Sequence, residues 1–245
     1  MADFAQGIQI SAVGVNAADP QDQHNTVSIL RDVTLQLNHP RTAIVGLNGS
    51  GKSTVLRLLN GLVTPTTGHV QVHGIDVARH WKIARRIVGF VFTDPAAQLL
   101  MPTAVEDVEL SLRATFQDPE RRHRRAEELL MAAGLKDHMH QSVYDLSGGQ
   151  RQLVALTSVL AVDPSVLVLD EPTTLLDLRN RARLMERLHD LSQQLVYATH
   201  DLELAATAHH VVVIHEGRVY AQGGPQLVED YHTWCVEGFP KVHGT

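Results

Sequence analysis

A glycine-rich stretch that ends in lysine and serine carries the clearest chemistry of the sequence. It reads Gly46-Leu47-Asn48-Gly49-Ser50-Gly51-Lys52-Ser53 and lies between an apolar run and a helical pattern. Its glycines let the backbone point N–H groups inward, where the N-terminus of the next helix completes a cradle for phosphate oxygens. Lys52 can bridge the β- and γ-phosphates, and the Ser53 hydroxyl can ligate Mg²⁺. We predict a nucleoside triphosphate site formed by Asn48, Gly49, Ser50, Gly51, Lys52, Ser53 and Thr54.

Two carboxylates follow an apolar run further along the chain. Residues 166–169 are all Val or Leu, and Asp170 and Glu171 come directly after them. We expect Asp170 to reach Mg²⁺ or its water shell. Glu171 can orient and deprotonate the attacking water, which matters because phosphoryl transfer depends mainly on positioning and charge stabilisation. Two acids after a strand can also be a solvated turn, but the phosphate loop favours the catalytic interpretation.

A second helix start has the small residues of an anion-binding terminus. It reads Leu146-Ser147-Gly148-Gly149-Gln150-Arg151 and precedes a helical run from Gln152 to Ala161. Ser147, Gly148 and Gly149 are therefore further candidates for nucleotide contact. One chain does not need two such termini for a single γ-phosphate. The pattern indicates a partner chain.

The elements that must position these residues alternate between strand and helix. Strand patterns occur at 42–45, 87–92, 166–169, 195–198 and 211–214, with helical patterns at 178–193 and 202–208. This alternation predicts right-handed crossovers and a mainly parallel sheet. Residues 8–10, 29–37 and 69–74 alternate in polarity and predict an antiparallel edge, with 69–74 as an exposed edge strand.

The remaining stretches complete the predicted architecture. From Thr93 to about Asp145 the apolar spacing is helical, with helices at 105–112 and 126–135 and a break at Asp118-Pro119. The segment 17–26 is rich in turn residues, and 237–245 is expected to be a loose tail. We predict an α/β protein with one domain over 1–245. Its core comprises 1–92 and 152–245, and 93–151 form a helical subdomain.

Together, these motifs resemble the ATP-binding subunits of ABC transporters. The matches are Walker A at 46–53, the family signature at 147–150, Walker B with its catalytic glutamate at 166–171, the D-loop at 174–177 and the switch histidine at His200. The resemblance implies a P-loop, RecA-like core and the cofactors ATP and Mg²⁺. Lys52, Glu171 and His200 are then the catalytic residues, and Ser53 and Asp170 belong to the metal site. It also implies a head-to-tail dimer, in which Ser147 and its glycines close over the nucleotide of the other subunit.

The sequence departs from the family pattern at two places. Thr93 stands where the family usually has a glutamine that touches the metal's water, so we assign Thr93 to the metal site and keep Gln98 as an alternative. No Phe, Trp or Tyr occurs between Phe4 and Trp81, so the aromatic residue that usually stacks on adenine is missing.

A narrower resemblance concerns the segment 93–108, which is similar to the corresponding part of energy-coupling-factor importers. These take up vitamins and transition-metal ions, and the Met101-Pro102-Thr103 sequence favours the biotin importer ATPase over the cobalt or nickel one. The implied partners are a second copy or a paralogous ATPase, a transmembrane coupling subunit and a substrate-binding membrane subunit. The implied location is peripheral, at the cytoplasmic face of the membrane.

Composition limits the alternatives. The 21 basic and 27 acidic residues give no bulk charge for nucleic acid, and the basic run 121–125 fits a solvated helix face. One cysteine, Cys235, and an N-terminus without a signal-peptide pattern indicate a cytoplasmic protein. Metal binding by the histidine groups 138/140 and 209/210/215 is disfavoured, because no Cys or carboxylate lies at ligand spacing. A soluble ABC-type ATPase of DNA repair or translation and a non-hydrolysing nucleotide-binding subunit remain as alternatives.

Overall fold

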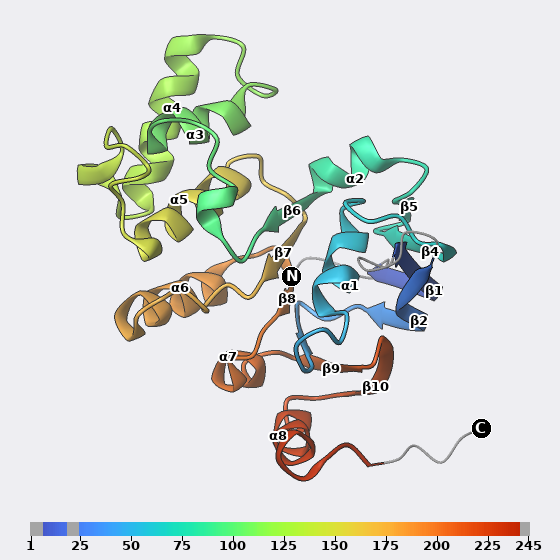
Figure 1. The fold of residues 1–245 in the computed structure, drawn as a ribbon. Helices are drawn as coiled ribbons and strands as arrows, with labels where there is room; N and C mark the ends of the chain where they lie inside the picture. Colours follow the sequence, from blue (N-terminus) through green and yellow to red (C-terminus); the bar gives the residue numbers. More distant parts are fainter. Residues whose placement is uncertain (1–6, 19–24, 241–245) are drawn as a thin grey trace. The chain divides into compact units, whose positions relative to one another are not determined.

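The structure, a computed structural model, describes residues 7–18 and 25–240. The chain packs as two compact units, one formed by 1–85 and 194–245 and the other by 86–193. The helix α2 (Trp81–Ile87) contains the boundary between them. The predicted helical subdomain over 93–151 stays a prediction, because this division groups it with neighbouring strands and helices (Figure 1).

The first unit contains an antiparallel sheet and a mainly parallel one. The antiparallel sheet has the order β2-β1-β4-β5, and four further strands follow the order β10-β9-β3-β8, of which only the β9–β10 pair is antiparallel. The elements of this unit are β1 (Ile8–Ala18), β2 (Thr26–Leu37), β3 (Arg41–Val45), α1 (Lys52–Leu59), β4 (Thr67–Val72), β5 (Ile75–Asp76), β8 (Gln194–Ala198), α7 (Leu202–Ala206), β9 (His210–His215), β10 (Arg218–Gly223) and α8 (Leu227–Glu237).

Burial explains why these sequences form these strands. In β8 every residue is buried, as are all residues of β3 and β9 except Arg41 and His215, which is typical of strands covered on both faces. In β2 the residues Val33, Leu35 and Leu37 alternate with exposed neighbours, so one face packs inward. The expectation of an antiparallel β1–β2 pair is confirmed. The prediction of 69–74 as an edge is wrong, because β4 pairs with β1 on one side and with the short β5 on the other.

The second unit combines the parallel pair β6–β7 with helices. Its elements are β6 (Val88–Val91), the 3₁₀ turn η1 (Pro95–Ala97), α3 (Ala104–Leu112), α4 (Pro119–Ala132), the 3₁₀ turn η2 (Lys136–His138), α5 (Gly148–Leu160), β7 (Val166–Asp170) and α6 (Leu178–Asp190). Asp118 caps α4 by accepting from the amides of Glu120 and Arg121, so the predicted break is the start of a helix.

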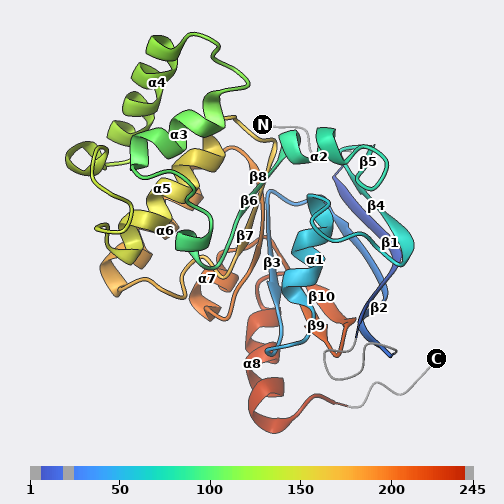
Figure 2. The same cartoon turned by 45° about the horizontal axis from the view of Figure 1, so that its top comes forward.

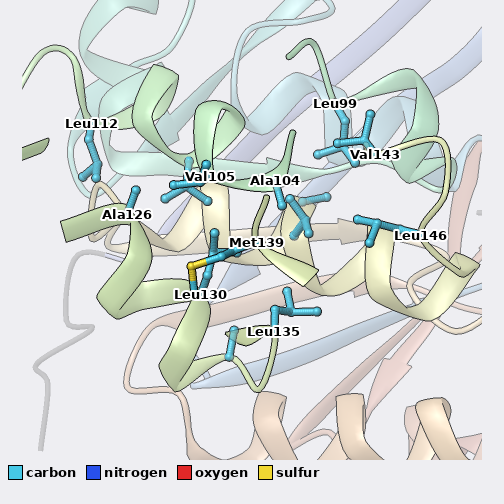
Figure 3. Close-up of a cluster of buried hydrophobic side chains, with 14 residues drawn as sticks. Leu99, Ala104, Val105, Leu112, Ala126, Leu130, Leu135, Met139, Val143 and Leu146 are labelled. Carbon is cyan, nitrogen blue, oxygen red and sulfur yellow. The ribbon is translucent and has the colours of Figure 1, made fainter. Parts of the chain in front are cut away.

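One hydrophobic cluster holds the helices of the second unit together. Figure 3 shows side chains from α3 and α4 meeting those of the 135–146 loop. Its members are Leu99, Ala104, Val105, Val108, Leu112, Ala126, Leu130, Ala133, Leu135, Met139, Val143, Leu146, Val154 and Ala155. The cluster runs from η1 to α5, so it supports both the 93–108 segment and the start of α5.

Candidate functional site

The glycine-rich loop connects a buried strand to a helix, as its sequence predicts. β3 ends at Val45 and α1 begins at Lys52, a succession that Figure 2 shows. Gly51 is the N-cap of α1 with φ +108°, and a β-carbon there would lie 2.6 Å from Leu30 Cδ2. Only glycine fits this position. Because Gly51 carries no side chain, nothing at the N-cap covers the amides of the first turn, and they can bind an anion.

Ser50 tests whether this loop fits a phosphate group. The residue is 5% exposed, and its hydroxyl has no hydrogen-bond partner among the described residues. A buried hydroxyl without a partner costs about 1–3 kcal/mol. A phosphate oxygen in the loop would accept a hydrogen bond from this hydroxyl. The loop therefore fits the triphosphate of ATP.

Lys52 and His200 meet at this loop. The Lys52 ammonium donates to the carbonyl oxygens of Gly46 at 2.8 Å and Leu47 at 3.2 Å, and lies 3.3 Å from His200 Nε2. An ammonium only donates, so Nε2 accepts and the imidazole proton is placed on Nδ1. The structure thus brings together two of the three predicted catalytic residues.

In the second unit, the predicted metal and catalytic residues lie at one end of the β6–β7 pair. The parallel register pairs Val91 with Leu169, so Thr93 and the carboxylates of Asp170 and Glu171 follow adjacent strand ends. Asp170 is 2% exposed. Glu171 has φ +51°, a left-handed conformation that is unfavourable for a residue with a β-carbon. Thr174 donates its hydroxyl to Glu171 Oε2 at 3.4 Å and its amide to the Glu171 carbonyl at 3.3 Å.

The alternative metal contact, Gln98, has a different role. Its side-chain oxygen accepts from the Phe92 amide at 3.0 Å, and its nitrogen donates to the Phe90 carbonyl at 3.2 Å. Both ends of the amide therefore hold the η1 segment against the end of β6. This arrangement favours Thr93 over Gln98 as the residue near the metal's water shell.

The signature residues form the capped start of α5. Ser147 Oγ accepts from the Gln150 amide at 3.3 Å, and Gln150 Oε1 accepts from the Ser147 amide at 2.7 Å, which is a capping box. A β-carbon on Gly149 would lie 2.6 Å from Asn180 Cγ at the start of α6. The Asp177 carboxylate fixes Asn180, because it accepts from the Asn180 backbone N–H at 2.7 Å and from the Asn180 side-chain Nδ2 at 3.0 Å. The predicted D-loop thus supports the signature.

The predicted site residues therefore form two groups, each within one unit. The phosphate-loop residues 48–54 and His200 belong to the first unit, and Thr93, Asp170, Glu171 and the signature residues 147–149 belong to the second. Phe4, the nearest aromatic residue before the phosphate loop in the sequence, lies outside the described residues.

Sequence reasoning missed Asp107, which organises the segment between β6 and α3. This carboxylate is 6% exposed, and its Oδ1 accepts from the amides of Leu100 at 2.8 Å and Met101 at 3.2 Å. Its Oδ2 accepts from the Ser158 hydroxyl at 2.9 Å, which ties the segment to α5. An acid among the apolar positions of a helix was the available signal.

The histidines that could suggest metal binding contact other groups. The His140 Nε2 lies 3.5 Å from Glu127 Oε1, the His210 ring stacks on His39 at 4.9 Å, and the His215 ring stacks on Phe239 at 3.8 Å. The basic run is only partly a solvated face. Arg122 is half-buried and lies 3.7 Å from Glu109 Oε2.

A P-loop ATPase is the class of protein that this fold and this loop define. The family model described as "ABC transporter" matches residues 30–174. A Bartonella quintana protein with the general name of an ABC transporter ATP-binding protein is 42% identical over 204 residues, 83% of this chain and 90% of that protein. The chain belongs to the ABC transporter ATP-binding family.

Two other relatives have more specific names. The biotin transport ATP-binding protein BioM of Rhizobium etli is 41% identical over 192 residues, 78% of this chain and 85% of that protein. The energy-coupling factor transporter ATP-binding protein EcfA1 of Halalkalibacterium halodurans is 35% identical over 211 residues, 83% of this chain and 76% of that protein.

Solved structures agree with the family. A dimeric ATP-binding cassette in a post-hydrolysis state, bound to ADP and Pi, has a TM-score of 0.78 and 29% identity, covering 89% of this chain and 98% of that one. The cbiO1 protein of Clostridium perfringens, part of the ABC transporter complex cbiONQ, has a TM-score of 0.77 and 27% identity, covering 94% and 93%. The chain is thus an ABC ATPase that hydrolyses ATP with Mg²⁺, in a family whose members dimerise and work with membrane subunits. Within 7–18 and 25–240, no helix has the length and apolarity to cross a membrane.

Proposed function

We propose that this chain is the ATPase subunit of an energy-coupling-factor importer that takes up a vitamin, with biotin favoured over cobalt or nickel ions. The observation that carries the proposal is the 41% identity to a biotin transport ATP-binding protein over 78% of the chain. The relative named EcfA1 and the cbiO1 structure support the importer class independently of biotin. We infer a peripheral position at the cytoplasmic face of the membrane, where the chain dimerises with itself or a paralogue. Its membrane partners are a coupling subunit and a substrate-binding subunit.

The proposed mechanism assigns binding to the first unit. Bound ATP with Mg²⁺ supplies the phosphoanhydride bond and the metal charge. The Ser50 hydroxyl and the amides of the first turn of α1 would hold phosphate oxygens, and Ser53 would ligate Mg²⁺. The Lys52 ammonium leaves the carbonyls of Gly46 and Leu47 to face the β- and γ-phosphates. His200 Nε2 is then released from Lys52, and an imidazole N–H can donate to the γ-phosphate, which makes His200 sensitive to that phosphate.

Hydrolysis is assigned to the second unit. Asp170 and Thr93 would hold Mg²⁺ through its bound water, and Glu171 would accept the proton of the attacking water. The Thr174 hydroxyl, which donates to Glu171 Oε2, restricts the carboxylate to one orientation. Ser147, Gly148 and Gly149 complete the nucleotide site of the other subunit. The helical subdomain 93–151, in which Asp107 ties the segment before α3 to α5, transmits closure of the dimer to the membrane partner.

Reconstitution tests this function. The tagged chain is co-purified with its partners from the native membrane and inserted into vesicles, and uptake of labelled biotin and of labelled Co²⁺ is measured with ATP enclosed in the vesicles, where it reaches complexes whose ATPase subunit faces inward. We expect ATP-dependent biotin uptake, with Glu171→Gln assembling normally but transporting nothing. Cobalt uptake without biotin uptake would overturn the assignment of biotin as the substrate. Purification with ribosomes or DNA, and ATP turnover that membrane partners leave unchanged, would overturn the importer assignment.

A further inference from the structure

Aromatic rings gather where α8 ends, although Phe, Trp and Tyr make up only 4% of the chain. The Phe239 ring lies 3.8 Å from the His215 ring, with 10° between their planes. The rings of Tyr220, Trp234 and Tyr231 surround Phe239 at 5.1, 6.1 and 6.4 Å. Offset-stacked and edge-to-face pairs at such distances stabilise the packing beyond the burial of the rings. We call these five residues the aromatic cluster.

This packing attaches the residues after α8 to the β9–β10 hairpin. Gly238, with φ +100°, ends the helix and turns the chain. The Tyr220 hydroxyl then donates to the Pro240 carbonyl at 2.8 Å. The prediction of a loose tail from residue 237 is therefore wrong for 238–240, and residues 241–245 lie outside the described part.

The same hairpin contacts the phosphate loop at two points. The Ile214 carbonyl lies so close to Gly46 that a β-carbon on Gly46 would overlap it. The Gly217 amide donates to the Ser50 carbonyl at 3.0 Å, and the Gly217 carbonyl accepts from the Arg31 amide at 2.8 Å. His215 lies between these two contacts in the chain. A displacement of His215 is therefore passed to both ends of the loop.

The aromatic cluster borders an open cavity beside the hairpin. The cavity has a volume of about 420 Å³, and its lining includes His215, Tyr220 and Phe239 together with Arg31 and Arg218. The pairing of β9 with β3 holds one strand of the hairpin, and the stack of His215 on Phe239 adds a second restraint on the side of the cavity, where packing is open.

We propose that His215 and Phe239 are positioning residues for the phosphate loop. They touch no nucleotide themselves. Through Ile214 and Gly217 they fix the backbone of Gly46 and Ser50, and hence the direction of the Ser50 hydroxyl and the loop amides. Misplacement of groups by about 1 Å can lower the rate at a preorganised site by as much as 100-fold. A loop that is only more mobile should have a smaller effect. The inference rests on ATP binding and is independent of the transported substrate.

The test compares ring removal with ring replacement. Phe239→Ala and His215→Ala remove one partner of the stack, whereas Phe239→Tyr and His215→Phe retain a ring. Val236→Ala is the matched control, because Val236 lies on the same helix and is 73% exposed. Affinity is measured with a fluorescent ATP analogue. Amide exchange is followed in two peptides, 44–56 around the phosphate loop and 119–132 in α4.

We expect the two alanine variants to bind the analogue about 3–10-fold more weakly and to raise KM more than they lower kcat, with the ring-retaining variants near wild type. Exchange should rise in 44–56 and stay unchanged in 119–132. Wild-type affinity in both alanine variants, or an equal rise of exchange in both peptides, would overturn the proposal. If Phe239→Ala does not fold, Phe239→Leu keeps the volume without the stack and gives the same readout. Failure of the wild-type chain to bind the analogue would instead contradict nucleotide binding itself.

Discussion

The phosphate loop and the signature each lead into the N-terminus of a helix, but the two helices are capped differently. The first turn of α1 follows Gly51, which has no side chain to cap it, whereas α5 begins with a complete capping box between Ser147 and Gln150. No side chain of the N-cap occupies the amides of the first terminus, so a ligand can reach them, whereas the second terminus is capped by its own side chains. The difference fits our proposal that α1 binds phosphate within its own subunit, and that the start of α5 is a preformed surface for the nucleotide of the other subunit.

Replacing Glu171 by Gln should have the largest effect and should separate ATP hydrolysis from ATP binding. We expect turnover to fall by about 10²–10⁴-fold, because the base that takes the water's proton is lost. ATP affinity should stay near wild type, since the phosphate loop is unchanged. Steady-state hydrolysis and calorimetry measure the two quantities, with Glu128→Gln on the exposed face of α4 as the control. Turnover close to wild type would remove Glu171 from its role.

Local sequence was sufficient for the parts of the site that depend on local geometry. The phosphate loop, the acids at the end of β7 and the signature each combine a turn or cap with one adjoining element, so residue type and spacing determine them. Strands with continuous apolar residues, such as β8 and β9, were equally clear. These patterns predicted the family and the α/β fold, and the family match and the solved structures confirm both.

The parts that sequence missed depend on contacts between distant residues. β4 became an inner strand because the short β5 pairs with it, and Ile75-Asp76 alone gives no strand signal. Residues 238–240 are held by His215 and Tyr220, which lie about 20 residues away in the chain. Asp107 is stable in the interior because the amides of Leu100 and Met101 and the hydroxyl of Ser158 donate to its carboxylate.

Ser147→Arg tests whether the second terminus acts across a dimer. The variant should keep the ATP affinity of the single chain, because the phosphate loop is intact, but should lose ATP-driven dimerisation, since a long side chain blocks the approach of the γ-phosphate. Lys52→Ala should weaken ATP binding and also fail to dimerise. Sedimentation is measured with ATP on a Glu171→Gln background.

Mixing the two variants sharpens this test. A head-to-tail pair has one site with both changes and one site with neither, so part of the association should return. Full dimerisation of Ser147→Arg alone, or no recovery in the mixture, would contradict the shared site.

The smallest expected effects concern two histidines, one in each unit, whose stabilities should respond to pH with opposite sign. The His123 Nδ1 lies 2.6 Å from Glu109 Oε1, and this hydrogen bond raises the pKa of His123 above 6.5, against a smaller effect of burial, with Glu127 adding to the rise. Burial lowers the pKa of His210 below 6.5, and the neighbouring His39 adds to this. His123 therefore stabilises the fold as a cation and His210 as a neutral ring.

The stabilities of the two histidine variants should therefore respond to pH in opposite ways. The stabilisation by His123 is complete below pH 6.5 and is lost as the pH rises through its raised pKa, so His123→Gln should destabilise most in acid and least in alkali. The contribution of His210 is complete above pH 6.5 and is lost as the pH falls through its lowered pKa, so the difference between wild type and His210→Gln should shrink in acid. Urea unfolding of both variants and the wild type from pH 5 to 9 measures this, with His232→Gln on the exposed side of α8 as the control. Parallel pH profiles for the two variants would contradict the assignment of opposite charge states.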